Sequence, residues 1–145
     1  MSVGTICSRI VATASPDETV EEGALRMKEY GVGTLVVVNA SRQPHGIITD
    51  RDIMVRCVAE ARDPADTPVS DIMSSPVRTL HEASPLDEGL QAMQRVKARR
   101  LVITDDDGVL AGILSIDDVV SVLAEQVDRI GAVLEAQTRE VLKGV

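Results

Sequence analysis

The sequence predicts an α+β fold of two-layer α/β character, in which two related βαββα units are paired about a pseudo-two-fold axis and followed by a C-terminal helical extension. An offset of 66 residues, which takes residue 3 to residue 69, aligns residues 3–52 with residues 69–118 without a gap. Within each copy, short Val- and Ile-rich runs alternate with segments whose apolar residues recur at helical spacing. The identical pairs are Val3/Val69, Ile6/Ile72, Ser8/Ser74, Val11/Val77, Thr13/Thr79, Glu22/Glu88, Gly23/Gly89, Met27/Met93, Leu35/Leu101, Val36/Val102, Gly46/Gly112, Ile47/Ile113 and Asp52/Asp118.

Each copy begins with a short β run, at Ile10–Thr13 and at Val77–Leu80, that precedes a turn. A helix follows at Thr19–Tyr30 and at Pro85–Val96, because both segments show apolar residues at helical spacing and acidic residues early. Pro85 suits the first turn of its helix, where its missing backbone N–H is not needed.

Two strands joined by a turn-rich loop come next, and a final helix begins after Thr49 in the first copy and after Ser115 in the second. The predicted units span residues 3–62 and 69–127, with a Pro-flanked linker at 63–68 and a helical tail at 128–145. A copy of about 60 residues is marginal alone, so we expect the two copies to share one core. The matched strands are Thr34–Val38 with Arg100–Thr104, and Gly46–Ile48 with Gly112–Leu114.

Composition limits the classes of function. The formal charge of −8 and the pI near 4.7 argue against nucleic acid as the main partner, because backbone affinity rests on clustered Lys and Arg. The sequence shows neither a signal peptide nor a long apolar run, so we expect a cytoplasmic protein and no membrane partner. Cys7 and Cys57 lack metal-ligand spacing and are expected to be buried thiols. Tyr30 is the only aromatic residue, which predicts an aliphatic core and an aliphatic ligand pocket.

The segments GIITDRD (Gly46–Asp52) and GILSIDD (Gly112–Asp118) carry the chemistry. Ser/Thr followed three residues later by a carboxylate at a helix start is a capping box, which is the structural interpretation. The functional interpretation is that the free helix N-terminus binds phosphate and the carboxylate accepts both hydrogens of a ribose diol. The two interpretations are compatible.

With these motifs in register, residues 3–127 resemble the cystathionine-β-synthase (CBS) domain family, and the pair resembles a Bateman module. The resemblance rests on GIITDRDI (46–53), GILSIDDV (112–119), DIM (71–73) and TICSRIV (5–11). It implies binding of an adenosyl ligand, such as AMP, ADP, ATP or S-adenosylmethionine, in clefts between the copies. It also implies that the motif Asp holds the ribose and that the motif Thr or Ser lies near the phosphates.

Carried over by position, the resemblance implies two clefts. One combines Thr49 and Asp52 with the segments 77–79 and 99–101, and the other combines Ser115 and Asp118 with the segments 11–13 and 33–35. The predicted nucleotide-binding residues are Thr49, Asp52, Val77, Thr79, Arg99, Arg100 and Leu101 for the first cleft, and Ser115, Asp118, Val11, Thr13, Gly33 and Thr34 for the second.

The two clefts differ in charge. Arg99 and Arg100 would lie beside Thr49, with Arg51 near, whereas Asp117 replaces Arg51 in the second copy and would repel phosphate. We therefore expect the Thr49/Asp52 cleft to be the better site for a phosphorylated nucleotide. The alternative for the two arginines is a solvated strand edge.

The first hypothesis for function is a stand-alone regulatory module, in which the adenosyl ligand shifts the arrangement of the copies and a partner protein responds. A ligand-free structural or protein-interaction scaffold is the alternative. An enzyme is not expected, because no nucleophile with a base and no metal-ligand cluster has usable spacing, and neither a cofactor nor a metal is required. Apolar residues at steps of four and three continue through Ile130 and Leu134 to Val141. This is the spacing of a coiled-coil seam, and together with the resemblance it indicates a homodimer.

Overall fold

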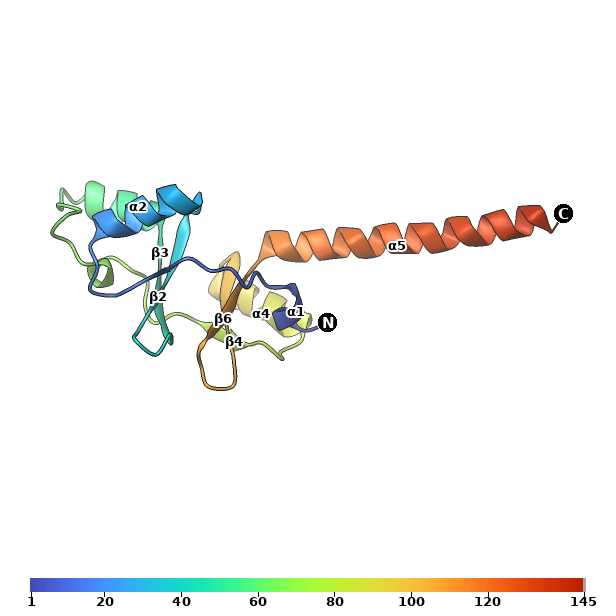
Figure 1. Ribbon diagram of the computed structural model, residues 1–145, viewed down its shortest axis with the longest axis horizontal. Coiled ribbons are helices and arrows are strands. Elements are labelled where there is room, and N and C mark those ends of the chain that lie inside the picture. Colours follow the sequence, from blue (N-terminus) through green and yellow to red (C-terminus); the bar gives the residue numbers. More distant parts are fainter. Residues whose placement is uncertain (145) are drawn as a thin grey trace.

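Two three-stranded sheets form the body of the molecule, and a long helix projects from it (Figure 1). The computed structural model describes residues 1–144. In the first sheet β1 (Thr13–Ala14) pairs in parallel with β2 (Thr34–Val38), which pairs antiparallel with β3 (Pro44–Thr49). The second sheet repeats this order. The predicted α+β fold of two related units is confirmed, and the second sheet is made of β4 (Thr79–His81), β5 (Arg100–Thr104) and β6 (Leu110–Ser115).

The first and last strands of each sheet differ in extent from their predictions. The parallel edge strands begin two or three residues later than expected, because only their last residues reach hydrogen-bonding distance of the neighbouring strand. The last strands are longer than the predicted three residues, since β3 and β6 pair with their neighbours over almost their whole length. The central strands β2 and β5 have the predicted bounds.

Two helices of equal length connect the parallel strands, α2 (Val20–Tyr30) and α4 (Leu86–Val96). A capping box between Thr19 and Glu22 begins α2. Pro85 precedes α4 with an extended backbone (φ −68°, ψ 152°), so it is the N-cap residue and not a first-turn residue as predicted.

The helices after β3 and β6 differ strongly. In the first half α3 (Asp50–Ile53) continues as a short π-helical segment, η1 (Met54–Val58), and stops. In the second half α5 (Ile116–Lys143) runs for 28 residues without a break, so that the predicted tail is the continuation of the last domain helix. The outer half of α5 extends away from the body (Figure 1).

The segment that leads each copy packs against the sheet of the other copy, so the two leading segments are exchanged. The short helix α1 (Val3–Ile6) packs into the apolar cluster of the second half with Leu101 and Leu114, and Val69 of the 3-10 helix η2 (Val69–Asp71) packs into that of the first half. Backbone hydrogen bonds fix both exchanges: Ser8 N donates to Ile113 O at 2.9 Å, and Ser74 N donates to Ile47 O at 2.8 Å. Each half of the body therefore contains residues from both copies.

Three apolar clusters hold the body together, where one shared core was expected. Two of them lie between a helix layer and its own sheet, because each helix already covers one sheet face. The third joins the inner faces of the two sheets. It is built from Val36, Val38, Val102 and Leu110, with Val11, Ile47, Val77 and Ile113 packed against it.

Both cysteines are buried and free, as predicted. Within residues 1–144 no helix is both long enough and apolar enough to cross a membrane. The same residues contain no group of three or more His, Cys, Asp or Glu side chains that could hold a metal ion.

Candidate functional site

Both copies of the motif form the capping box. Asp52 N donates to Thr49 Oγ1 at 3.1 Å, and Thr49 N donates to Asp52 Oδ2 at 2.9 Å. The Ser115/Asp118 box has the same two bonds, and Ser115 Oγ also donates to Asp118 Oδ2 at 2.7 Å. Each motif therefore forms a complete capping box at the start of its helix, in which Oδ2 of the carboxylate is the acceptor. The structural interpretation of the motif is confirmed.

Strand alternation directs the motif hydroxyls toward the space between the sheets. Ile47 and Ile113 contribute to the cluster between the sheets, and Thr49 and Ser115 each lie two residues further along the same strand. Arg100 stands two residues before Val102 of the same cluster and therefore also lies on the inner face. This end of the inner faces carries hydroxyl and guanidinium groups beside apolar side chains.

A cavity of about 690 Å³, cavity B, opens at this end between the two sheets. Ile47 of β3 lies on one side of it, and the linker after η2, the end of α4 and the start of β5 form the rest of the wall. Its lining residues are Ile47, Ser74, Pro76, Val77, Arg78, Val96, Ala98, Arg100 and Leu101.

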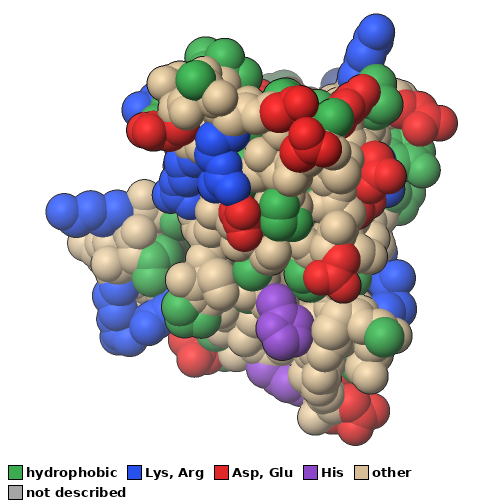
Figure 2. Space-filling view, turned by 90° about the vertical axis from the view of Figure 1, so that its left-hand side faces the viewer, with side chains coloured by type: hydrophobic (Ala, Val, Ile, Leu, Met, Phe, Trp, Pro, Cys, Tyr) green, Lys and Arg blue, Asp and Glu red, His purple; other side chains and the backbone are tan. Residues whose placement is uncertain are grey.

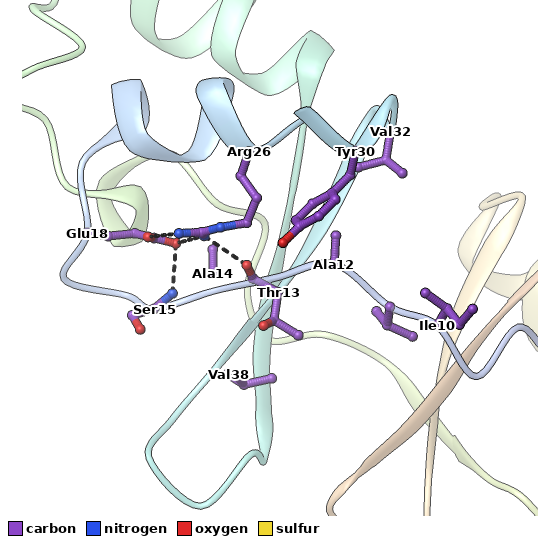
Figure 3. A pocket seen from close by; sticks show the side chains of 11 residues that line it. Ile10, Ala12, Thr13, Ala14, Ser15, Glu18, Arg26, Tyr30, Val32 and Val38 are labelled. Carbon is purple, nitrogen blue, oxygen red and sulfur yellow. Dashed lines mark hydrogen bonds and ion pairs between the residues drawn. The ribbon is translucent and has the colours of Figure 1, made fainter. Parts of the chain in front are cut away.

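A second cavity of about 670 Å³, cavity A, lies against the first half (Figure 3). It is lined by the segment Ile10–Ser15, by Glu18, Arg26 and Tyr30, and by Val32 and Val38. The offset of 66 that relates the copies also relates the two cavities. The equivalent lining pairs are Ile10/Pro76, Val11/Val77, Ala12/Arg78, Tyr30/Val96 and Val32/Ala98.

The predicted site residues divide between these cavities and their surroundings. Val77, Arg100 and Leu101 line cavity B, and Val11 and Thr13 line cavity A. The remaining predicted residues lie outside both linings. They are the motif residues Thr49, Asp52, Ser115 and Asp118, together with Gly33, Thr34, Thr79 and Arg99.

The surroundings of these remaining residues follow from the sheet register. Thr34 pairs with Thr49 across the strands β2 and β3, and Gly33 O accepts a hydrogen bond from Asp50 N at 3.0 Å. Thr79 pairs with Val102 in the second sheet. Roles for these residues in binding a nucleotide stay predictions.

Arg99 points elsewhere than its neighbour Arg100. One guanidinium nitrogen lies 3.4 Å from the Asp117 carboxylate, and both side chains are largely exposed. Asp117 was expected to repel phosphate in the second copy, and Arg99 was expected beside Thr49. In the structure these two side chains pair with each other.

The polar group of cavity A is an ion pair. Arg26 Nη2 donates to Glu18 Oε2 at 2.8 Å and Nη1 donates to the Thr13 carbonyl at 2.9 Å (Figure 3). The hydrogen bond with Glu18 raises the pKa of the Arg26 guanidinium, so the guanidinium keeps its positive charge. The sequence alone did not predict Glu18, Arg26 or Tyr30 as site residues. The one available signal was the position of Tyr30 at the end of the predicted helix.

Basic and acidic side chains are interspersed on the face seen in Figure 2, and they form no continuous basic surface there. In cavity B, positive charge comes from the individual arginines Arg78 and Arg100.

The family model of the CBS domain matches residues 3–58 and 69–125, which are the two copies of the repeat. The chain belongs to the CBS domain family. The resemblance inferred from the duplicated motifs is thereby confirmed, and the body is a tandem CBS pair.

Known CBS proteins resemble the chain in sequence and in fold. An uncharacterized protein of Methanopyrus kandleri is 41% identical over 122 residues, which are 84% of this chain and 62% of that protein. The CBS domain-containing protein YhcV of Bacillus subtilis is 39% identical over 108 residues, 74% of this chain and 75% of that protein. A putative signal-transduction protein with CBS domains from Burkholderia ambifaria has a solved structure with a TM-score of 0.76 and 32% identity, covering 87% of this chain and 96% of that chain.

One further solved CBS pair carries ligands. It was determined in complex with 5′-methylthioadenosine and S-adenosyl-L-methionine, and it aligns with a TM-score of 0.74 at 24% identity over 85% of this chain and 99% of that one. The two proteins share the fold.

Proposed function

We propose that this CBS pair is a regulatory module that binds an adenosyl ligand between its two repeats, with AMP, ADP and ATP as first candidates, and signals to a partner protein by a conformational change. The observation that carries the proposal is cavity B, of about 690 Å³, which opens between the two sheets; cavity A, of about 670 Å³, occupies the equivalent place in the first half. Both volumes lie in the range typical of small-molecule sites. Their walls are mainly aliphatic, which suits the faces of a purine base.

Cavity B is the better candidate for a phosphorylated ligand. Arg78 and Arg100 line it, and within residues 1–144 neither takes part in an ion pair. Free guanidinium groups bind phosphate with charge-assisted, often bidentate hydrogen bonds. Thr49 lies on the same inner face as Ile47 of this cavity, and Asp52, joined to Thr49 by the capping box, is the proposed ribose ligand.

A ligand in cavity B would contact both halves. Ile47 belongs to the first sheet and Leu101 to the second, so a change in the angle between the sheets changes both walls of the cavity. A ligand that fits one arrangement better shifts the population toward it, and a partner protein that binds the same arrangement responds. The complex of another CBS pair with 5′-methylthioadenosine and S-adenosyl-L-methionine supports an adenosyl ligand for this fold.

A homodimer is part of the proposal. The face of α5 that carries the seam residues is exposed, with Val127, Ile130 and Leu134 each more than half accessible. A helix that projects into water with such a face needs a partner to be stable. A second copy of α5 is the proposed partner.

The alternative function is a scaffold without a ligand, which the exposed apolar side chains Leu25, Met54 and Val58 on α2 and η1 favour. A thermal-shift series with AMP, ADP, ATP, S-adenosylmethionine and NAD separates the two functions. The regulatory proposal expects a rise in Tm that grows with the concentration of at least one adenosyl compound, whereas guanosine nucleotides serve as controls. An unchanged Tm with every adenosyl compound would support the scaffold.

A further inference from the structure

The two cavities occupy equivalent positions but differ in the side chains that decide which ligand they can take. Where cavity B has Arg78 and Val96, cavity A has Ala12 and Tyr30. We infer that cavity A binds an uncharged purine nucleoside stacked on Tyr30 and excludes nucleotides that carry a phosphate. This inference rests on the proposed function, since it names the ligand class of one of the two proposed sites.

The charges inside cavity A leave no cation for a phosphate. The Arg26 guanidinium is held by both carboxylate oxygens of Glu18, at 2.5 and 2.8 Å, and one of its nitrogens also donates to a backbone carbonyl. The Glu18 side chain is only 13% exposed and accepts a further hydrogen bond from Ser15 N at 3.0 Å. A phosphate would have to break this partly buried pair or lie beside the Glu18 carboxylate, and both are unfavourable.

Cavity B contains no such pair. The residues equivalent to Glu18 and Arg26 in the second copy are Ser84 and Ala92, which carry no charge. The difference between the cavities is thus a neutralised ion pair in one and two arginines in the other.

Part of the apolar wall of cavity A is exposed to solvent. Tyr30 is 62% exposed and Ile10 is 93% exposed, although both line the cavity. Figure 3 shows the Tyr30 ring beside Ala12 and Val32, with Ile10 further along the same segment. A planar base placed on the ring would cover exposed apolar surface, and stacking on an aromatic side chain strengthens binding of a base roughly tenfold or more.

The only tyrosine of the chain reports on this cavity alone. The sequence has one Tyr and no Trp, so intrinsic emission comes from Tyr30. Adenosine and 5′-methylthioadenosine are titrated against AMP, which adds only a phosphate to adenosine. Free N-acetyltyrosinamide at the same absorbance corrects for light absorbed by the purine.

The inference expects both uncharged nucleosides to change the Tyr30 emission in a saturable manner, with AMP at least tenfold weaker by the same signal. Two variants of Tyr30 form a matched pair: Tyr30→Val has the residue of the equivalent position in cavity B, and Tyr30→Phe keeps the aromatic ring. In calorimetry, Tyr30→Val weakens adenosine binding about tenfold or more, whereas Tyr30→Phe retains it. A thermal melt of each variant checks that it is folded.

Two results would overturn the inference. One is an unchanged emission with both nucleosides while AMP or ATP still raises Tm; the proposed function would then stand and the ligand class of cavity A would be wrong. The other is equal affinity of AMP and adenosine by Tyr30 emission. If no adenosyl compound changes either emission or Tm, the inference and the proposed function are both wrong.

Discussion

Replacing Gly112 by alanine places a methyl group inside the contact between β6 and the exchanged N-terminal segment. A Cβ at this position would stand 2.6 Å from Cys7 Sγ and 2.7 Å from the carbonyl oxygen of Ser8. The backbone cannot move away freely, because Ser8 and Ile113 exchange two hydrogen bonds at 2.9 and 3.0 Å. The substitution must therefore displace the segment that carries α1.

Overpacking of this kind costs about 1–3 kcal/mol, and weakening two backbone hydrogen bonds adds about 1 kcal/mol or more. We expect Gly112→Ala to lower the free energy of unfolding by about 2–4 kcal/mol, which corresponds to a fall in Tm of roughly 5–15 °C for a chain of this size. The assay is thermal and urea unfolding followed by far-UV circular dichroism. Gly131→Ala is the matched control, because a Cβ there meets nothing within 4 Å and alanine stabilises an exposed helix by about 0.5–1 kcal/mol.

A Gly112→Ala variant that melts within about 1 °C of the wild type would refute the exchange of leading segments. Gly46 tests the same geometry in the other half, since a Cβ there would stand 2.9 Å from the carbonyl oxygen of Ser74. The pseudo-two-fold arrangement requires both substitutions to destabilise.

Two further predictions concern the thiols and α5. Both thiols are buried, and burial also raises the pKa of the Cys7 thiol. Because a reagent cannot reach a buried thiol, neither cysteine should react with a thiol reagent at pH 8 until the chain unfolds; rapid labelling of Cys7 alone would show that the N-terminal segment detaches. Because the folded pKa lies above the unfolded value, the stability from this thiol is fully present below the unfolded pKa and is lost as pH rises through the folded pKa. Leu134 belongs to the seam of α5, so Leu134→Lys should convert the proposed dimer to a monomer in analytical ultracentrifugation. Ala136→Lys, which lies off the seam, should leave the dimer intact. A wild-type protein that sediments as a monomer would contradict the proposed pairing of α5.

Much of the fold could be predicted from the repeat. The strands at 34–38 and 100–104 and the helix starts after Thr49 and Ser115 agree with the structure, because local periodicity and capping chemistry determine such elements. The exchange of the leading segments could not be predicted. Val3 and Val69 are equivalent apolar residues, and the sequence signal is the same whichever half each one packs into.

The candidate site was predicted in part, and the deviations have physical causes. Arg99 lies just before β5 and pairs with Asp117, so that of the two arginines only Arg100 lines cavity B. The single aromatic residue predicts an aliphatic core and an aliphatic ligand pocket, yet the exposed ring of Tyr30 forms part of the wall of cavity A. The ion pair of Arg26 with Glu18 joins residues eight apart around the start of α2, which a helical pattern alone does not show.

Calorimetric titration of AMP into the wild type and into the double variant Arg78→Ala/Arg100→Thr tests most directly whether cavity B is a nucleotide site. The replacements are the residues that the first copy has at the equivalent positions, Ala12 and Thr34, so the variant keeps side chains that the fold already accommodates. Loss of two charge-assisted hydrogen bonds, at about 1.5–3 kcal/mol each, predicts AMP binding more than a hundredfold weaker with little change in Tm of the free protein. AMP binding of undiminished affinity in the double variant would contradict the assignment of the phosphate to Arg78 and Arg100.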